Sequence, residues 1–331
     1  MTCLGSQRRL TGIFGISALI PSTFITPVIA HHITVVIPHL NQPQMLARCL
    51  ASLAAGQRRP DAVIVVDNGS LTLPTAMCQT FADVRLLQEA TPGPGPARNH
   101  GVAQSTSDIL AFIDADCIAD PGWLAAAATA MTDPAAQILG GDVRIALVNP
   151  ARLTQLEAYE SIYAYRMDRY IAREGFTGTG NLVVRRAVLD AVGPFAGIGV
   201  AEDRDWGQRA TRAGHVIRYV PGMRVYHPAR LHQTELRQKW DRHMAHDFAA
   251  VPGHPVARVK WLLKTLAMAV SPLAEIPRIL TSDRIEGLRN RALAFVGLGR
   301  IRLYRAGRMA QLFLGADPAL LAGRWNRPKA G

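Results

Sequence analysis

The chain has 331 residues, of which 49% are hydrophobic and 19% charged, a composition that fits a globular protein with a sizeable core and excludes a disordered chain. Its four cysteines are scattered without a C-x-x-C pair, which fits a reducing cytoplasm and argues against a disulfide framework or a zinc knuckle. The formal net charge is +12, and the excess is concentrated after residue 277, where eleven Lys and Arg stand against three Asp and Glu.

The first segment, residues 1–32, is expected to lie outside the fold. Its uncharged run at 10–30 is long enough to cross a bilayer, but Pro21, Pro27 and five Ser or Thr weaken the interpretation as a membrane anchor. Two alternatives stay open, a hydrophobic anchor and a loosely ordered leader. We favour the leader, because two histidines alone separate the run from the first strand.

Strands and helices are predicted to alternate from residue 33 onward. Short runs rich in Val, Ile and Leu predict strands, and apolar residues at three- and four-residue spacing predict helices. In chain order the expected elements are strand 33–38, helix 43–55, strand 62–67, a weaker helix, strand 84–87, helix 97–104 and strand 109–113. This alternation indicates an α/β fold with a largely parallel sheet whose two faces are covered.

The alternation continues with longer elements up to about residue 228. The expected elements are a helix from 121 to about 131, strand 137–148, a tyrosine-rich helix 150–173, strand 182–185, a helix from 202 to near 214 and a short strand 224–228. The tyrosines of the long helix could form a wall for an acceptor, or they could simply pack against the sheet. We assign residues 33–255 to this α/β domain.

The remaining residues, 256–331, are predicted to form a basic and apolar helical extension. The stretch from Trp261 is strongly apolar, but Lys264, Pro272 and Glu275 interrupt any clean span, so these helices are expected to lie on a membrane rather than to cross it. The alternative is a soluble extension that covers its own apolar face. Positive charge suits anionic lipid and nucleic acid equally, but the region lacks interleaved aromatics, so we expect an anionic membrane surface and no nucleic acid as its partner.

Two carboxylates follow strand 109–113 directly. Asp114 and Asp116 are one residue apart, and in an extended chain such side chains leave the same face, at the edge where open α/β sheets bind ligands. Neighbouring anions resist desolvation unless a cation joins them, and oxygen ligands suit Mg²⁺ or Mn²⁺ shared with a diphosphate. The pattern favours a metal–diphosphate site, with a plain turn as the alternative.

Further polar residues fall at the ends of predicted elements. Asp67 lies at the C-terminal end of a predicted strand, as Asp114 does. Glu202 and Asp203 open a helix, where acidic residues can also serve as caps or respond to the helix dipole. His227 closes a short strand, a position at which a single histidine is more often structural. Each of these signals is weak by itself.

Seven short motifs occur in a fixed order: Val-Val-Ile-Pro38 with Asn41, Val-Val-Asp67-Asn-Gly-Ser, Gly-Pro-Ala-Arg98-Asn, Asp114-Ala-Asp116, Thr-Gly-Asn181, Glu202-Asp203 and His227. Together they resemble the glycosyltransferase family 2 domain with the GT-A fold, a Rossmann-like sheet with flanking helices. The resemblance covers about residues 33 to 228. Leu40 and Asn68 depart from the commonest pattern, which puts the identity of the donor in doubt more than the mechanism.

The resemblance implies a nucleotide-sugar site and a metal site. The residues implied for the nucleotide sugar are Pro38, Asn41, Asp67, Arg98, Asp114 and Asp116. Asp67 would hold the base, and Arg98 would lie beside it near the diphosphate. Asp116 would bind Mg²⁺ or Mn²⁺, with Asp114 contacting the ribose or sharing the metal and His227 adding a metal or diphosphate contact.

The resemblance also implies an acceptor side and a reaction. Gly180 and Asn181 would border the acceptor, and Asp203 would be the general base, with Glu202 as the rival base. The implied function is metal-dependent, inverting transfer of a sugar from a nucleotide diphosphate sugar, UDP-hexose favoured, to a hydroxyl of a lipid-linked or surface-glycan acceptor. The expected location is the cytoplasmic face of the inner membrane, or the cytoplasm. A nucleotidyltransferase with a similar metal–nucleotide site stays as the alternative.

Overall fold

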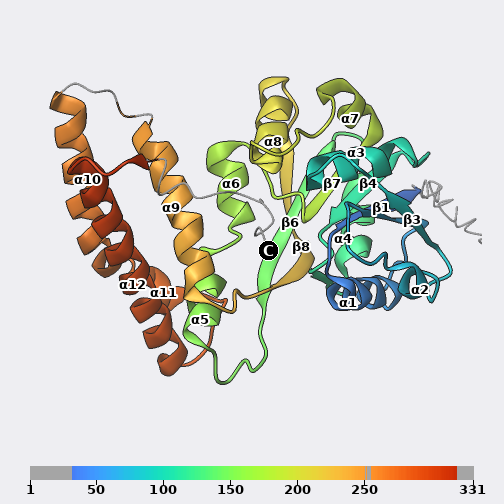
Figure 1. Cartoon of the computed structure of the whole chain (residues 1–331). Coiled ribbons are helices and arrows are strands. Elements are labelled where there is room, and N and C mark those ends of the chain that lie inside the picture. Colours follow the sequence, from blue (N-terminus) through green and yellow to red (C-terminus); the bar gives the residue numbers. More distant parts are fainter. Residues whose placement is uncertain (1–31, 250, 252–254, 319–331) are drawn as a thin grey trace, which may run out of the picture. The chain divides into compact units, whose positions relative to one another are not determined.

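The computed structural model describes residues 32–249, 251 and 255–318, and these form a mixed sheet of eight strands with helices on both faces (Figure 1). The strands are β1 (Ile33–His39), β2 (Ala62–Asp67), β3 (Val84–Gln88), β4 (Ile109–Ile113), β5 (Ile118–Ala119), β6 (Ile138–Ala146), β7 (Asn181–Arg185) and β8 (Ile217–Pro228). The helices are α1 (Pro43–Ala54), α2 (Thr75–Cys78), α3 (Pro94–Ala103), α4 (Trp123–Met131), α5 (Gln155–Tyr163), α6 (Met167–Glu174), α7 (Arg186–Val192), α8 (Glu202–Arg212), α9 (Gln233–Ala249), α10 (Pro255–Ala274), α11 (Ile276–Thr281) and α12 (Leu288–Phe313).

The sheet is parallel on one side and mixed on the other. In the strand order β3-β2-β1-β4-β7-β6-β8-β5, the first four strands are parallel to one another, as the alternation of strands and helices predicted. β7 lies antiparallel between β4 and β6, and β6 runs parallel to β8. The apolar runs predicted the positions of these strands but not whether each runs parallel or antiparallel to its neighbours. A strand that is buried on both faces of a sheet has an apolar sequence in either direction.

Alternating residues of the central strands fill two cores, one on each face of the sheet. In β1, Val35 packs with the core that α1 and α4 cover, while Val36 packs with the core that α3 and α8 cover. α1 contributes Leu46, Cys49, Leu50 and Leu53, whose spacing places them on one side of the helix. With both faces covered, ligands have access to the sheet through the loops at the strand ends.

Two predicted elements are different in the structure. The single helix expected at 150–173 is wrong: it is two helices, α5 and α6, and the link contains Tyr165 with a φ of 48°. The short strand expected at 224–228 is the end of the twelve-residue β8, whose pairing with β6 shifts register between Gly141 and Asp142. Such an irregularity lets a strand contain a Pro-Gly pair, although a Pro-Gly pair in a sequence normally predicts that a strand ends there.

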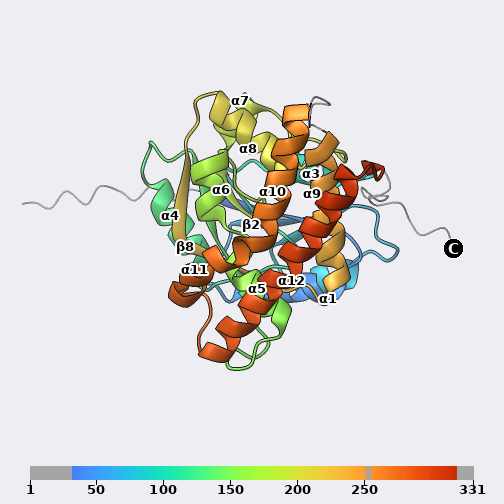
Figure 2. The same cartoon turned by 90° about the vertical axis from the view of Figure 1, so that its left-hand side faces the viewer.

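The C-terminal helices pack on α5 and on one another. Figure 2 shows α9, α10 and α12 side by side, and α12 shares a core with α5 through Leu298 and Ile301. Arg284 also donates to Asp142 Oδ1 at 2.5 Å, which ties the segment before α12 to the sheet. Within the described residues, no helix combines the length and the hydropathy that a membrane span requires. Residues 1–31 of the predicted leader lie outside the described part.

Candidate active site

The loops after β1 and β2 are braced against each other by side chains that the motifs had singled out. Asp67 is 1% exposed, and its Oδ1 accepts from the backbone N–H of Ser70 at 2.9 Å while its Oδ2 lies 2.9 Å from His39 Nδ1. Asn41 Oδ1 accepts from the N–H of Leu71 at 2.9 Å. Burial alone would raise the pKa of Asp67, but the hydrogen bonds from Ser70 and His39 lower it. Asp67 is therefore an anion that holds the shape of this loop.

His39 was missed by the sequence interpretation. It is 2% exposed, and the N–H of Gln42 donates to its Nε2 at 3.2 Å, so its Nδ1 carries the proton that Asp67 accepts. The only signal in the sequence was a polar residue directly after Pro38 at the end of an apolar strand. That signal predicts burial poorly, because polar residues are common where strands end.

Arg98 bridges two acidic residues that are far apart in the sequence. Its Nη2 donates to Asp114 Oδ1 at 2.6 Å and its Nη1 donates to Glu202 Oε1 at 3.0 Å. Arg98 projects from α3, and the residue is 2% exposed. Arg98 is thus buried between the strand-end carboxylate and the first turn of α8, and its predicted place near the diphosphate stays a prediction.

The two carboxylates after β4 have different partners. The N–H of Cys117 donates to the carbonyl of Asp114 at 3.0 Å, so this stretch is a turn rather than extended chain, and the side chains of Asp114 and Asp116 have different partners. Gly180 lies against Asp114, because a Cβ at residue 180 would come within 2.5 Å of Asp114 Oδ2. Gly180 thus lies next to Asp114, where a side chain at residue 180 would displace the carboxylate, and its predicted place beside the acceptor stays a prediction.

Asp116 faces His227 on the other side of this turn. Asp116 Oδ2 and His227 Nε2 are 3.4 Å apart. Burial raises the pKa of Asp116, and Asp114 raises it further, while His227 acts in the opposite direction. A buried carboxylate with a raised pKa is one that a cation would stabilise as an anion.

His227 Nε2 lies between the Asp116 carboxylate and the hydroxyl of Tyr165. Its Nδ1 lies 2.7 Å from the backbone carbonyl of Pro228, which can only accept, so Nδ1 is the protonated nitrogen. Its Nε2 accepts from the hydroxyl of Tyr165 at 3.1 Å, and the two rings are 4.5 Å apart. An imidazole ring held through Nδ1 by a backbone carbonyl is the usual arrangement of a histidine that binds a metal through Nε2.

The donor atoms here fit a divalent ion that is shared with a substrate. No group of three or more His, Cys, Asp or Glu side chains in the described part of the chain could hold a metal by itself. Asp116 and His227 supply one oxygen and one nitrogen that face each other, and Mg²⁺ commonly takes its other ligands from phosphates and water. Asp114, whose Oδ1 binds Arg98, has its other oxygen left for a third contact.

Glu202 and Asp203 lie in the first turn of α8 but do not cap it. The N-cap residue is Ala201, which has no side-chain hydrogen bond, so the alternative of a capping role is set aside. Burial raises the pKa of Asp203, and the neighbouring Glu202 raises it further. Asp203 lies beside the loop before β7, since a Cβ on Gly178 would be 3.9 Å from Asp203 Oδ2.

Asn181 is a structural residue rather than a residue that borders an acceptor. It is 0% exposed, and its Oδ1 accepts from Trp123 Nε1 at 2.8 Å. Its Nδ2 donates to the carbonyls of Asp142 and Met223, both at 2.9 Å. Its amide thus joins β7, β6, β8 and α4, and the prediction that it contacts an acceptor is wrong for its side chain.

The tyrosines of the 150–173 segment separate into different environments. Tyr159 and Tyr163 stack on each other at 5.3 Å where α5 packs on the C-terminal helices, so they serve packing, but against these helices rather than against the sheet. Tyr165 contacts His227. Tyr170 stacks on Phe176 at 5.2 Å, close enough to Asp203 for that carboxylate to raise the pKa of the phenol.

Comparison with known proteins identifies relatives of this arrangement. The family model described as glycosyl transferase family 2 matches residues 34–193. The chain is 31% identical over 207 residues to glycosyltransferase AglE of Haloferax volcanii, which covers 60% of this chain and 67% of that protein. It is 28% identical over 284 residues to the pre-mycofactocin glycosyltransferase of Mycobacterium tuberculosis, covering 76% of this chain and 57% of that protein, so it spans little more than half the length of the mycobacterial relative.

Among solved structures, the fold is similar to that of the mannosyltransferase PcManGT from Pyrobaculum calidifontis, determined in complex with GDP-Man and Mn²⁺. The two superpose with a TM-score of 0.52 and 16% sequence identity over 88% of this chain and 87% of that one. At this identity the likeness concerns the fold.

Proposed function

This chain belongs to glycosyltransferase family 2 and has the GT-A fold, and from that premise we propose that it is a metal-dependent, inverting hexosyltransferase. The proposed reaction moves a sugar from a nucleotide diphosphate sugar, UDP-hexose favoured, to a hydroxyl of a lipid-linked or surface-glycan acceptor. The observation that carries the proposal is a pair of acidic centres, Asp116 with His227 and Asp203 beside Gly178, whose neighbours Asp114 and Glu202 are joined by the buried guanidinium of Arg98. The nucleotidyltransferase alternative is set aside, because the named relatives are glycosyltransferases.

On the donor side, Asp116 and His227 would hold the divalent ion. Breaking a sugar–phosphate bond leaves negative charge on the departing diphosphate, and a bound Mg²⁺ or Mn²⁺ supplies the positive charge that stabilises it. Asp116 contributes a carboxylate whose raised pKa favours a cationic partner, and His227 contributes Nε2 of a ring that the Pro228 carbonyl orients through Nδ1. Asp67 and Asn41 shape the loops that would receive the base.

On the acceptor side, Asp203 is the better candidate for the general base. Glu202 already accepts a charge-assisted hydrogen bond from Arg98 at 3.0 Å, which occupies one of its oxygens and stabilises its anion. Asp203 has a pKa raised by burial and by Glu202, and a carboxylate with a raised pKa is a stronger base toward an incoming hydroxyl. Removal of the hydroxyl proton by Asp203 would allow direct displacement at the anomeric carbon, which inverts its configuration.

Arg98 takes a positioning role in this proposal. Its guanidinium fixes Asp114, which lies against Gly180, and Glu202, which precedes the proposed base. A planar guanidinium with two carboxylate partners holds both at defined positions. The donor side and the acceptor side would therefore keep a constant separation when the sugar is bound between them.

We also propose that the enzyme works at the cytoplasmic face of the inner membrane as a peripheral protein. The support is the charge of the C-terminal region: residues 255–318 contain eleven Lys and Arg against four Asp and Glu. Anionic headgroups attract such a region, and a lipid-linked or surface-glycan acceptor is found at the same surface.

The experiment that tests the proposed function is a donor screen. The protein is incubated with UDP- and GDP-sugars and Mg²⁺ or Mn²⁺, and free nucleotide is measured. GDP-mannose belongs in the panel because the structurally similar archaeal enzyme was determined with GDP-Man. We expect release from a UDP-hexose that stops when a chelator removes the metal. Release that is unaffected by chelation would overturn the metal site, and no release from any sugar nucleotide would overturn the donor assignment.

A further inference from the structure

Helix α10 presents an apolar row to the outside. Its buried side is formed by Trp261, Thr265, Met268 and Pro272, spaced four, three and four residues apart. The opposite side, which we name the α10 outer row, consists of Val259, Leu263, Leu266, Val270 and Leu273, with exposed fractions of 55%, 60%, 58%, 65% and 65%. Within the described residues this apolar row stays exposed, and exposed apolar surface of this kind marks an interaction site.

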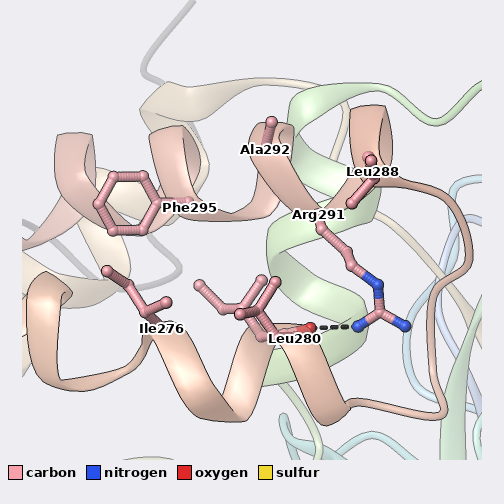
Figure 3. Close-up of a pocket in the computed structure, with 7 residues that line it drawn as sticks. Ile276, Leu280, Leu288, Arg291, Ala292 and Phe295 are labelled. Carbon is pink, nitrogen blue, oxygen red and sulfur yellow. Dashed lines mark hydrogen bonds between the residues drawn. The ribbon is translucent and has the colours of Figure 1, made fainter.

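The exposed apolar surface continues past the end of α10. Ile276 and Leu280 of α11 are 38% and 55% exposed, and Leu288 at the start of α12 is 81% exposed. These three residues line a pocket of about 280 Å³ between α11 and α12, together with Phe295 (Figure 3). The guanidinium of Arg291 is turned to the backbone at one end of this pocket, where it donates to the carbonyl of Ile279.

Positive charge accompanies this surface. α10 contains three cationic residues, Arg258, Lys260 and Lys264, and no acidic residue, and all three cations are exposed. Arg258 and Lys260 lie on the two flanks of the outer row, each about 100° around the helix from Val259, whereas Lys264 Nζ is 3.7 Å from Asp247 Oδ2. An apolar row with flanking cations is the pattern of helices that lie in a membrane interface, where long basic side chains extend to the headgroups.

We propose that the α10 outer row inserts into the interface of an anionic bilayer, with the helix parallel to the membrane plane. The α10 outer row would be the surface through which the enzyme binds the membrane at the peripheral location proposed above. The inference rests on the proposed function only for the nature of the acceptor. A second copy of the chain is the less favourable occupant, because two helices with three cations and no acidic residue each, in regions 255–318 with a net charge of +7, would repel each other. Anionic headgroups complement that charge, and each basic residue near them raises partitioning about fivefold.

The test uses the full chain and sedimentation with large vesicles of mixed phosphatidylglycerol and phosphatidylcholine. The variant Leu263→Gln, Leu266→Gln, Val270→Gln keeps good helix formers on α10 and should lower partitioning by about a hundredfold, because three apolar side chains no longer enter the bilayer. The matched control, Val148→Gln, Val216→Gln, Leu231→Gln, removes three equally apolar residues that are 93%, 73% and 83% exposed elsewhere and should bind like the original chain. Pure phosphatidylcholine vesicles should bind far less protein, and circular dichroism should show that both variants are folded.

Several results would overturn the inference. They are no vesicle binding by the original chain, equal binding by the outer-row variant and its control, or equal binding to neutral and anionic vesicles. A dimer in sedimentation equilibrium that the outer-row variant dissociates, without vesicle binding, would assign the row to a subunit interface instead. Should the outer-row variant unfold, Lys260→Gln with a salt titration provides the second measurement, since weaker and less salt-sensitive binding is expected. Nucleotide release with a soluble acceptor is measured in parallel, so a failed donor assignment is distinguishable from a failed membrane surface.

Discussion

Replacing Asn181 with leucine tests whether this residue is structural or contacts the acceptor. The change removes hydrogen bonds to Trp123 Nε1 and to the carbonyls of Asp142 and Met223 at a position that is 0% exposed. An unpaired buried indole N–H costs about 1–3 kcal/mol, and each lost carbonyl bond costs about 1 kcal/mol. The expected loss of unfolding free energy is thus about 3–5 kcal/mol, which in a domain of this size lowers the Tm by roughly 10 °C.

The assay is thermal and urea denaturation of a double-mutant cycle with Trp123→Phe. The single change Trp123→Phe leaves only Asn181 Oδ1 unpaired and should cost about 1–2 kcal/mol. The double variant should be more stable than the sum of the single changes predicts, by about 1 kcal/mol, because the orphaned indole N–H is gone. A variant Asn181→Leu with a near-normal Tm and a KM for the acceptor raised tenfold would refute this reasoning and return Asn181 to the acceptor site.

Three further predictions concern the acidic centres. Asp203→Asn should lower kcat by roughly 10² to 10⁴ with donor affinity unchanged, whereas Glu202→Gln should cost less; the reverse order in initial rates would make Glu202 the base. Burial and Glu202 raise the folded-state pKa of Asp203 above its unfolded value, so this group destabilises the fold as pH rises through the folded pKa. Asp203→Asn should therefore raise the Tm at pH 7, with the gain lost below the ordinary pKa of Asp, and an unchanged or lower Tm at pH 7 would contradict the buried, raised-pKa carboxylate. His227→Ala should weaken Mn²⁺-dependent nucleotide binding in calorimetry without lowering the Tm of the ligand-free protein, and a change in Tm alone would make the residue structural.

The residues that form the centre of the sheet could be read from the sequence because their burial leaves a local pattern. β2 and β4 begin and end where the apolar runs predicted, and β1 is one residue longer than predicted. Central strands covered on both faces need an unbroken run of Val, Ile and Leu, and such a run is visible without any neighbour. The same rule placed Asp67 at the end of β2 and Asp114 just after β4, at one edge of the sheet.

Hydrogen-bond partners could not be predicted in the same way. The bond between Arg98 and Glu202 joins residues 104 positions apart, and the bond between Trp123 and Asn181 joins residues 58 positions apart. The motif order marked Arg98, Asn181 and Glu202 as important but did not say that Arg98 is buried or that Asn181 is enclosed. Trp123 carried no functional signal, since a tryptophan at the start of a helix is usually interpreted as core.

The break between α5 and α6 is another feature that the local sequence does not predict. Apolar and aromatic residues continue through 150–173 at helical spacing, and that spacing contains nothing that ends a helix at Ala164. Tyr165 adopts a φ of 48°, which is unfavourable for a tyrosine, and its hydroxyl reaches Nε2 of His227, 62 residues further along the chain. Sequence periodicity and composition determine which segments are buried, because burial depends on neighbours within a few residues. Only the packed chain determines which side chain is enclosed, strained or paired, because those properties depend on residues that the fold brings together from distant positions.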